Sequence, residues 1–171
     1  LVQSSSGRSL SWRRAATGMR SVCACLSTAS SAIWFSANRR NSARANGPLY
    51  LRHEGGRVQL GFRVESRHTN PMGICHGGMM ASFCDMLLPL VAHRQVPDVA
   101  RRFLPTISLQ IDYLAPSPAG AWVQGEAQVL RTTRSMVFAQ GLVTADGVPV
   151  ARASGIMKIG PEFGGPEEAV G

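Results

Sequence analysis

One stretch of the chain, from His68 to Asp85, gathers residue types that can perform chemistry on a carbonyl group. It reads HTNPMGICHGGMMASFCD. A loop containing Asn70 delivers the triplet His76-Gly77-Gly78 into a long apolar run, and Asp85 is the only acid between Glu65 and Asp98. An unpaired carboxylate is costly to bury, so an acid in apolar surroundings calls for a functional explanation.

A carbonyl oxygen gains negative charge when its carbon is attacked, and fixed hydrogen-bond donors stabilise that charge. A helix that begins at Gly77 would offer free N–H groups and a positive dipole end. Gly77 and Gly78 lack a Cβ, so a substrate can approach their backbone closely. Asp85 could then accept a proton from water or attack directly. Two alternatives remain open: Asp85 as a structural acid bonded to backbone, and His76 as a residue that only stabilises the loop.

The spacing of Gly77 and Asp85 predicts a shared site. Asp85 lies eight residues beyond Gly77, which is about 12 Å along a helix at 1.5 Å per residue. Both residues therefore cannot reach one carbonyl from the same helix. If both take part, Gly77 of one subunit combines with Asp85 of another, and the protein is expected to be at least a dimer.

The run from Gly77 to about Arg94 predicts a helix that is apolar on nearly all sides and therefore buried all round. Pro89 interrupts this pattern. It removes the hydrogen bond to the carbonyl of Asp85, so we expect a kink or a loosened turn there.

The remaining segments predict strands. Residues 48–52 and 57–64 flank Glu54-Gly55-Gly56 as a hairpin, and alternation of period two marks the later segments. Asp146-Gly147 is a strong hairpin signal. A helix without a polar face must be wrapped by a curved sheet, which predicts an α+β hot-dog fold with an antiparallel sheet around one long central helix. The four later strand segments are 103–113, 121–130, 136–145 and 148–159.

The chain of 171 residues carries a net charge of +8, but residues 1–53 hold eight Arg and no acid, while the remainder is neutral. A neutral body gives no reason to expect nucleic-acid binding. No stretch approaches the roughly 20 apolar residues of a membrane span. The four Cys lack metal-ligand spacing, so we expect reduced structural thiols, no metal and no cofactor.

We expect three regions: a poorly ordered basic leader over residues 1–47, a hot-dog domain over 48–160 and a Gly/Pro-rich tail over 161–171. The Arg- and Ser-rich leader is also compatible with a transit peptide or an export signal. The expected location is the cytoplasm unless the leader is a targeting segment.

Residues 48–160 resemble the hot-dog thioesterase superfamily, specifically the PaaI-type acyl-CoA thioesterases of phenylacetate degradation and their mammalian relatives. The resemblance rests on His68-Thr69-Asn70-Pro71-Met72-Gly73, on His76-Gly77-Gly78, on Asp85, and on the strand end Asp112-Tyr113-Leu114-Ala115-Pro116.

This resemblance implies an enzyme that hydrolyses acyl-CoA thioesters. It also implies that dimers pair further, so we expect a homodimer or a homotetramer. Asp85 matches the general base or nucleophile, and Asn70 matches an Asn that orients nucleophile or substrate. His76 and Gly77 match the pair around the thioester carbonyl, and Thr106 matches a Ser or Thr that assists the attacking water. Among the residues themselves, Gly78, Phe83 and Ile107 are candidate substrate-binding residues, and Phe83, Leu87 and Ile107 are candidate apolar pocket walls. Arg101, Arg102, Arg131 and Arg134 could hold CoA phosphates or be solvated.

A non-catalytic acyl-CoA sensor on the same fold is the alternative function. Such a sensor would keep Gly77 and lose the acid, so Asp85 and Asn70 favour the enzyme. A hot-dog hydratase would need a His five residues after Asp85, and that position is Leu90. We also expect solvated side chains for His68 and His93.

Overall fold

The structure, a computed structural model, describes residues 46–54 and 56–163. Most of the predicted leader and tail lies outside these residues, so the three-region division and the interpretations of the leader remain predictions. Among the described residues, no helix combines the length and the apolar character needed to cross a membrane.

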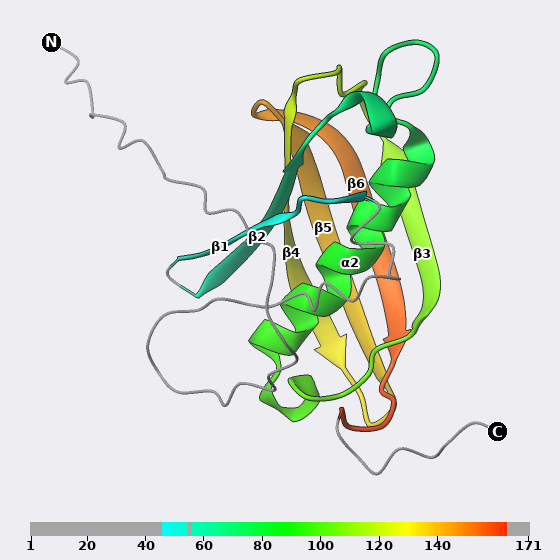
Figure 1. The fold of residues 1–171 in the computed structure, drawn as a ribbon. Coiled ribbons are helices and arrows are strands. Elements are labelled where there is room, and N and C mark those ends of the chain that lie inside the picture. The colour runs from blue at the N-terminus through cyan, green and yellow to red at the C-terminus, as the bar shows by residue number, and fades with distance from the viewer. Residues whose placement is uncertain (1–45, 55, 164–171) are drawn as a thin grey trace, which may run out of the picture.

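The fold is one curved antiparallel sheet wrapped around one long helix (Figure 1). The six strands lie in the order β1-β2-β4-β5-β6-β3, and every neighbouring pair is antiparallel. This confirms the predicted α+β hot-dog architecture. The strands are β1 (Tyr50–Glu54), β2 (Arg57–Arg63), β3 (Thr106–Tyr113), β4 (Trp122–Thr132), β5 (Met136–Ala145) and β6 (Val148–Lys158).

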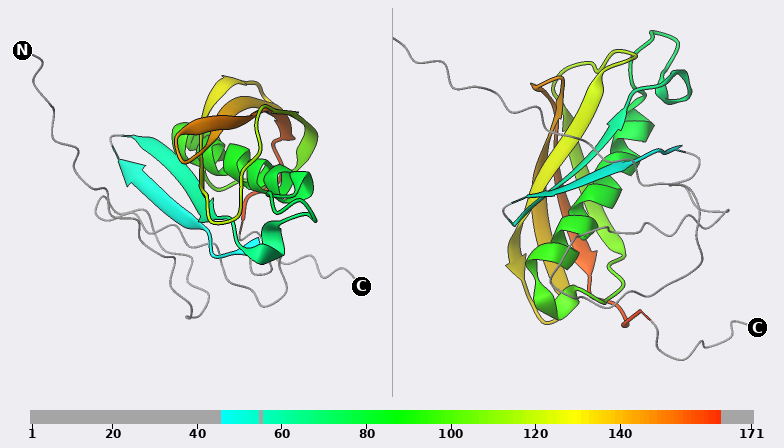
Figure 2. Two further views of the ribbon diagram at one scale, coloured as in Figure 1. Left: turned by 90° about the horizontal axis from the view of Figure 1, so that it is seen from above. Right: turned by 60° about the vertical axis from the view of Figure 1, so that its left-hand side comes forward.

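Helix α2 (Gly77–Gln95) fills the hollow of the sheet, as the view from above shows (Figure 2). Two short 3-10 turns, η1 (Ser66–His68) and η2 (Pro97–Val99), lie before and after it. The fully buried side chains come from both layers, which is what a two-layer core requires. They include Phe62, Phe83, Leu87, Leu88, Val123, Val137, Val143 and Met157.

One face of α2 departs from the prediction of a helix buried all round. Gly78 and Asp85 are exposed, and Ala81, Ser82 and Pro89 are only half-buried. These residues recur every three to four positions, so they form one stripe along the helix. A count of apolar residues does not reveal the stripe, because its other members are small or apolar. The helix runs through Pro89 without ending, and the ring lies on the open stripe rather than against the sheet.

The strand boundaries shift by a few residues from those predicted. The segment predicted from Phe103 forms a strand only from Thr106, and the first strand begins at Tyr50 rather than Pro48. The Asp146-Gly147 turn joins β5 to β6 as predicted, with φ of 47° at Asp146 and 86° at Gly147. Two residues with positive φ are the requirement of a type I′ hairpin turn.

Gly125 of β4 lies close to side chains of α2, which leads to a stability prediction. A Cβ at this position would lie 2.5 Å from Leu87 and 3.1 Å from Phe83, both fully buried. Gly125→Ala should therefore overpack the core and lower the free energy of unfolding by about 1–3 kcal/mol, measured by urea denaturation. Gln128→Ala, an exposed position on the same strand, is the control, with an effect within about 0.5 kcal/mol. An equally stable Gly125→Ala variant would contradict this packing.

Candidate active site

Asp85 lies on the open stripe of α2 and is held by a residue of the edge strand. The Thr106 hydroxyl, at the start of β3, donates a hydrogen bond of 2.7 Å to Asp85 Oδ1. The carboxylate is exposed in the single subunit, and it accepts its hydrogen bond from this hydroxyl rather than from a backbone N–H. The structure thus brings together two residues that are 21 positions apart in the sequence, and the side chain of Asp85 has the access that chemistry needs.

His76 caps the N-terminus of α2. Its Nδ1 accepts a hydrogen bond of 2.9 Å from Gly78 N–H, and its carbonyl accepts from the N–H groups of Met79 and Met80. A ring nitrogen that accepts a hydrogen bond carries no proton, so a neutral His76 ring has its proton on Nε2. A Cβ on Gly78 would lie 3.0 Å from His76 Nδ1, so the cap favours glycine at this position.

The cap leaves one backbone donor of the first turn available. Within residues 46–54 and 56–163, no acceptor lies in hydrogen-bonding position to the N–H of Gly77. A free N–H at a helix N-terminus also carries the positive end of the helix dipole. Gly77 therefore has the backbone donor that a developing oxyanion would require.

Tyr113, at the far end of β3, contacts this same turn of the helix. Its hydroxyl donates to the carbonyl of Gly77 at 2.9 Å, and its ring would lie 3.4 Å from a Cβ on Gly77. Burial raises the pKa of the Tyr113 phenol, with smaller contributions from Cys84 and Cys75, so the hydroxyl remains a donor at neutral pH. Sequence reasoning assigned Tyr113 no role, because nothing local indicates a contact 36 residues away.

Asn70 forms a tight turn that leads towards the helix. Its Oδ1 accepts from Met72 N–H at 3.0 Å, and its backbone pairs with Ile74 and Gly73. Its amide Nδ2 has no acceptor among the described residues and can donate to another molecule. The turn therefore fixes the side chain without using up its donors.

The two histidines that we expected to be solvated are not. His68 is 2% exposed and lies edge-on against Phe62, with ring centroids 5.3 Å apart. His93 is half-buried with Nε2 2.8 Å from the carbonyl of Arg102, and burial lowers its pKa. The expectation failed because burial of a polar ring depends on partners that are distant in sequence.

The cysteines near the site are ordinary protonated thiols. Burial raises the pKa of Cys75 to about 11 and that of Cys84 to about 12, where Asp85 contributes further. Cys75 Sγ lies 3.8 Å from the carbonyl oxygen of His76 rather than being bonded to its ring. Because the thiolate is the reactive form, neither thiol is suited to nucleophilic attack at neutral pH.

The predicted pocket walls separate in the structure. Ile107 is 56% exposed beside Thr106 on the edge strand. Phe83 is fully buried on the sheet side of α2, near Phe62 and Gly125, and so is Leu87. These two side chains therefore pack the core of the subunit, whereas Ile107 and the substrate-binding candidate Gly78 are exposed.

The arginines proposed for CoA phosphates also differ from one another. Arg102 is half-buried and donates to the carbonyl of Gly160 at 3.1 Å, with Glu162 3.7 Å away. It therefore holds the C-terminal segment in place. Arg101, Arg131 and Arg134 are exposed and remain predictions as phosphate ligands.

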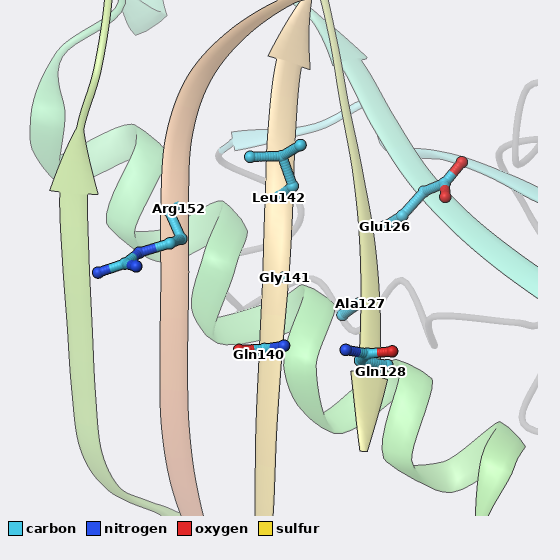
Figure 3. Close-up of a pocket in the computed structure, with 7 residues that line it drawn as sticks. All are labelled: Glu126, Ala127, Gln128, Gln140, Gly141, Leu142 and Arg152. Atoms are coloured by element: carbon cyan, nitrogen blue, oxygen red, sulfur yellow. The ribbon is translucent and has the colours of Figure 1, made fainter. Parts of the chain in front are cut away.

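A shallow hollow of about 330 Å³ lies across β4, β5 and β6, on the side of the sheet away from α2 (Figure 3). Its charged members already have partners, since Arg152 pairs with Asp112 at 2.8 Å and Glu126 accepts from Gln59. The hollow lies on the opposite side of the sheet from α2, which carries Asp85, so it is not part of the candidate active site. The lining residues are Glu126, Ala127, Gln128, Gln140, Gly141, Leu142 and Arg152.

The contact between Thr106 and Asp85 leads to a kinetic prediction. Thr106→Val keeps the shape of the side chain but removes a donor to a carboxylate, an interaction worth about 1.5–3 kcal/mol. We expect kcat for the thioester hydrolysis that the family resemblance implies to fall by about 10- to 100-fold, measured at saturating substrate, while Thr106→Ser retains most of the activity. Equal kcat for Thr106→Val and the wild type would mean that this hydroxyl does not support Asp85.

Comparison with known proteins shows a similarity to thioesterases. Residues 72–151 match the family model described as the thioesterase superfamily. Acyl-coenzyme A thioesterase 13 of Homo sapiens is 29% identical over 103 residues, 58% of this chain and 69% of that protein.

Two solved structures are similar in fold. The E. coli PaaI protein of the phenylacetic acid degradation operon superposes with a TM-score of 0.62 at 20% identity, covering 71% of this chain and 85% of that chain. A "hypothetical thioesterase protein" of Streptococcus pneumoniae, solved with coenzyme A, gives a TM-score of 0.60 at 19% identity, covering 67% and 88%. With its helix wrapped by a six-stranded antiparallel sheet, the chain has the hot-dog fold of these structures, and its residues 72–151 are similar in sequence to the thioesterase superfamily.

Proposed function

We propose that the protein is an acyl-CoA thioesterase that releases CoA and a carboxylic acid. The observation that carries this proposal is that α2 has both a free N–H at its N-terminal residue Gly77 and an exposed carboxylate at Asp85. The names of the relatives support a thioester substrate, and the coenzyme A bound to the S. pneumoniae protein supports the CoA group.

The proposed chemistry uses four side chains or backbone groups. Gly77 N–H donates to the thioester carbonyl oxygen, with Asn70 and His76 Nε2–H as further donors nearby. Asp85 takes a proton from water, the hydroxide adds to the carbonyl carbon, and the C–S bond breaks to release the CoA thiolate. Asp85 returns the proton to the thiolate. A direct attack by Asp85 would instead form an acyl-enzyme that water then hydrolyses.

We further propose that the site forms between two subunits. β3 is one of the two edge strands of the sheet, with Thr106 and Asp85 at its start and Tyr113 and Gly77 at its end. If β3 pairs antiparallel with its own copy about a two-fold axis, the start of one strand faces the end of the other. Asp85 of one subunit then approaches Gly77 of the partner. The two groups can therefore act on one carbonyl, although they are about 12 Å apart along a single helix.

The unpaired edge itself supports this arrangement. Ile107 and Tyr113 on β3 are 56% and 57% exposed in the single subunit. An edge strand with exposed apolar side chains is a template for pairing with another chain. A second copy of the chain would pair with this edge and would also cover the open stripe of α2.

A panel of thioesters tests the function. The purified protein is incubated with acyl-CoAs of several chain lengths and with an aromatic acyl-CoA, and the free CoA thiol is titrated. Oxygen esters of the same acids serve as matched controls, and we expect turnover of at least one thioester. Tight binding of acyl-CoA by calorimetry without release of thiol from any of them would favour the sensor instead.

A further inference from the structure

The loop that leads into α2 is built on a buried histidine. His68 and Ser117 are the two buried polar side chains of the described part of the chain. The carbonyl of His68 accepts from His76 N–H at 2.8 Å, and that of Ser117 accepts from Cys75 N–H at 2.8 Å. The two residues that precede Gly77 are therefore fixed from both sides.

The ring of His68 is fixed as firmly as its backbone. Its Nδ1 accepts a hydrogen bond of 3.0 Å from Glu65 N–H, which places the proton of the neutral ring on Nε2. The ring lies edge-on to Phe62, whose own ring centroid is 5.1 Å from that of Phe83 in α2. The His68 side chain thus attaches the loop to the core.

A continuous series of hydrogen bonds joins this ring to the carbonyl-binding end of the site. Glu65 N–H bonds the His68 ring, the His68 carbonyl bonds His76 N–H, and the His76 ring bonds Gly78 N–H. This last bond removes Gly78 N–H from use and leaves Gly77 N–H as the free donor. A donor stabilises a developing oxyanion only if its direction is fixed before the reaction.

Burying the His68 ring has a free-energy cost, and packing alone does not explain why the ring is retained. His68 Nε2 has no hydrogen-bond partner and is buried. An unsatisfied buried donor lowers stability, and each such group in a native protein requires a reason. A phenylalanine would fill the same space without the orphan donor, but it could not accept from Glu65 N–H.

We propose that His68 is a positioning residue that sets the orientation of His76 and of the Gly77 N–H. This inference rests on the proposed function, because it assigns His68 to the carbonyl-binding end of that site. His68 does not itself touch the substrate. It acts through the loop, so its removal should change kcat more than KM.

Three variants of the full chain separate positioning from packing. His68→Phe keeps a ring in the core but loses the acceptor for Glu65 N–H. His68→Asn loses the ring but retains an acceptor oxygen at the position of Nδ1. Ser117→Ala is the matched control, because Ser117 is equally buried and its hydroxyl also has no partner.

The readouts are kcat and KM for an acyl-CoA, the melting temperature, and NMR signals of the Gly78 amide and the His76 ring nitrogens. For His68→Phe we expect a kcat at least about tenfold lower, near-normal melting and a shifted Gly78 amide. For His68→Asn we expect lower melting, near-normal kcat and unchanged Gly78 and His76 signals. Ser117→Ala should resemble the wild type.

The inference is overturned if kcat follows melting temperature across the variants, since a purely structural role predicts that order. Unchanged kcat and unchanged Gly78 and His76 signals in His68→Phe would overturn it as well. If the wild type hydrolyses no thioester, the proposed function fails, and the NMR signals alone then decide whether His68 orients the loop.

Discussion

Replacing Asp85 by asparagine should lower kcat for thioester hydrolysis about a thousandfold, within the range attributed to general acid–base catalysis. An amide can neither accept the proton of the attacking water nor attack the carbonyl itself. The oxygen of the introduced amide would still accept the hydrogen bond from Thr106, so the local structure should persist. Because substrate contacts elsewhere are retained, KM should change little, and steady-state kinetics on the preferred acyl-CoA measures both quantities.

The matched control for this variant is Asp112→Asn, which makes the same chemical change on strand β3. Asp112 pairs with Arg152 at 2.8 Å, away from α2, so the same chemical change there should leave kcat unaltered. A near-normal kcat for Asp85→Asn would eliminate Asp85 as base and as nucleophile. Loss of activity in both variants would point to a charge effect on folding rather than to chemistry.

Much of the fold follows from local patterns in the sequence. Alternation along 148–158 and the Asp146-Gly147 turn are enough to specify β6 and its hairpin, because side-chain direction and turn conformation are short-range properties. The long apolar run likewise specifies α2. Its open stripe could not be predicted, since Ala81, Ser82 and Pro89 are small or apolar and give no contrast with the buried face.

The candidate site shows the same division between local and distant information. The cap at His76 and the turn at Asn70 involve neighbours in the sequence, and their residue types indicate them. Thr106 was reached only through a family resemblance, and the contact with Tyr113 was not anticipated. Both contacts require β3 to lie beside α2. The order of the elements along the chain does not say which residues of β3 lie opposite Asp85 and Gly77. His68 was misjudged for a related reason, because its burial depends on Phe62 in another element.

Two inactive variants should restore activity when their subunits are mixed, because each intact site would draw on both. Gly77→Val places methyl groups beside Tyr113 and over the free N–H, so its homodimer should be inactive, as should that of Asp85→Asn. A mixed dimer contains one doubly altered site and one with native Asp85 and Gly77. Random exchange makes half of the dimers mixed, so total activity should recover to about a quarter of the wild-type value.

The control for this exchange mixes Asp85→Asn with Thr106→Val. These residues contact each other within one subunit, so each site of a mixed dimer carries one of the two changes and no native site is regenerated. Subunits with different affinity tags allow the mixed dimers to be isolated and their content verified. Isolated mixed dimers of Asp85→Asn and Gly77→Val that remain inactive would place both groups within a single subunit. Asp85 and Gly77 would then have to act on one substrate despite their separation of about 12 Å along α2. Pairing of β3 strands would not be needed to form the catalytic site.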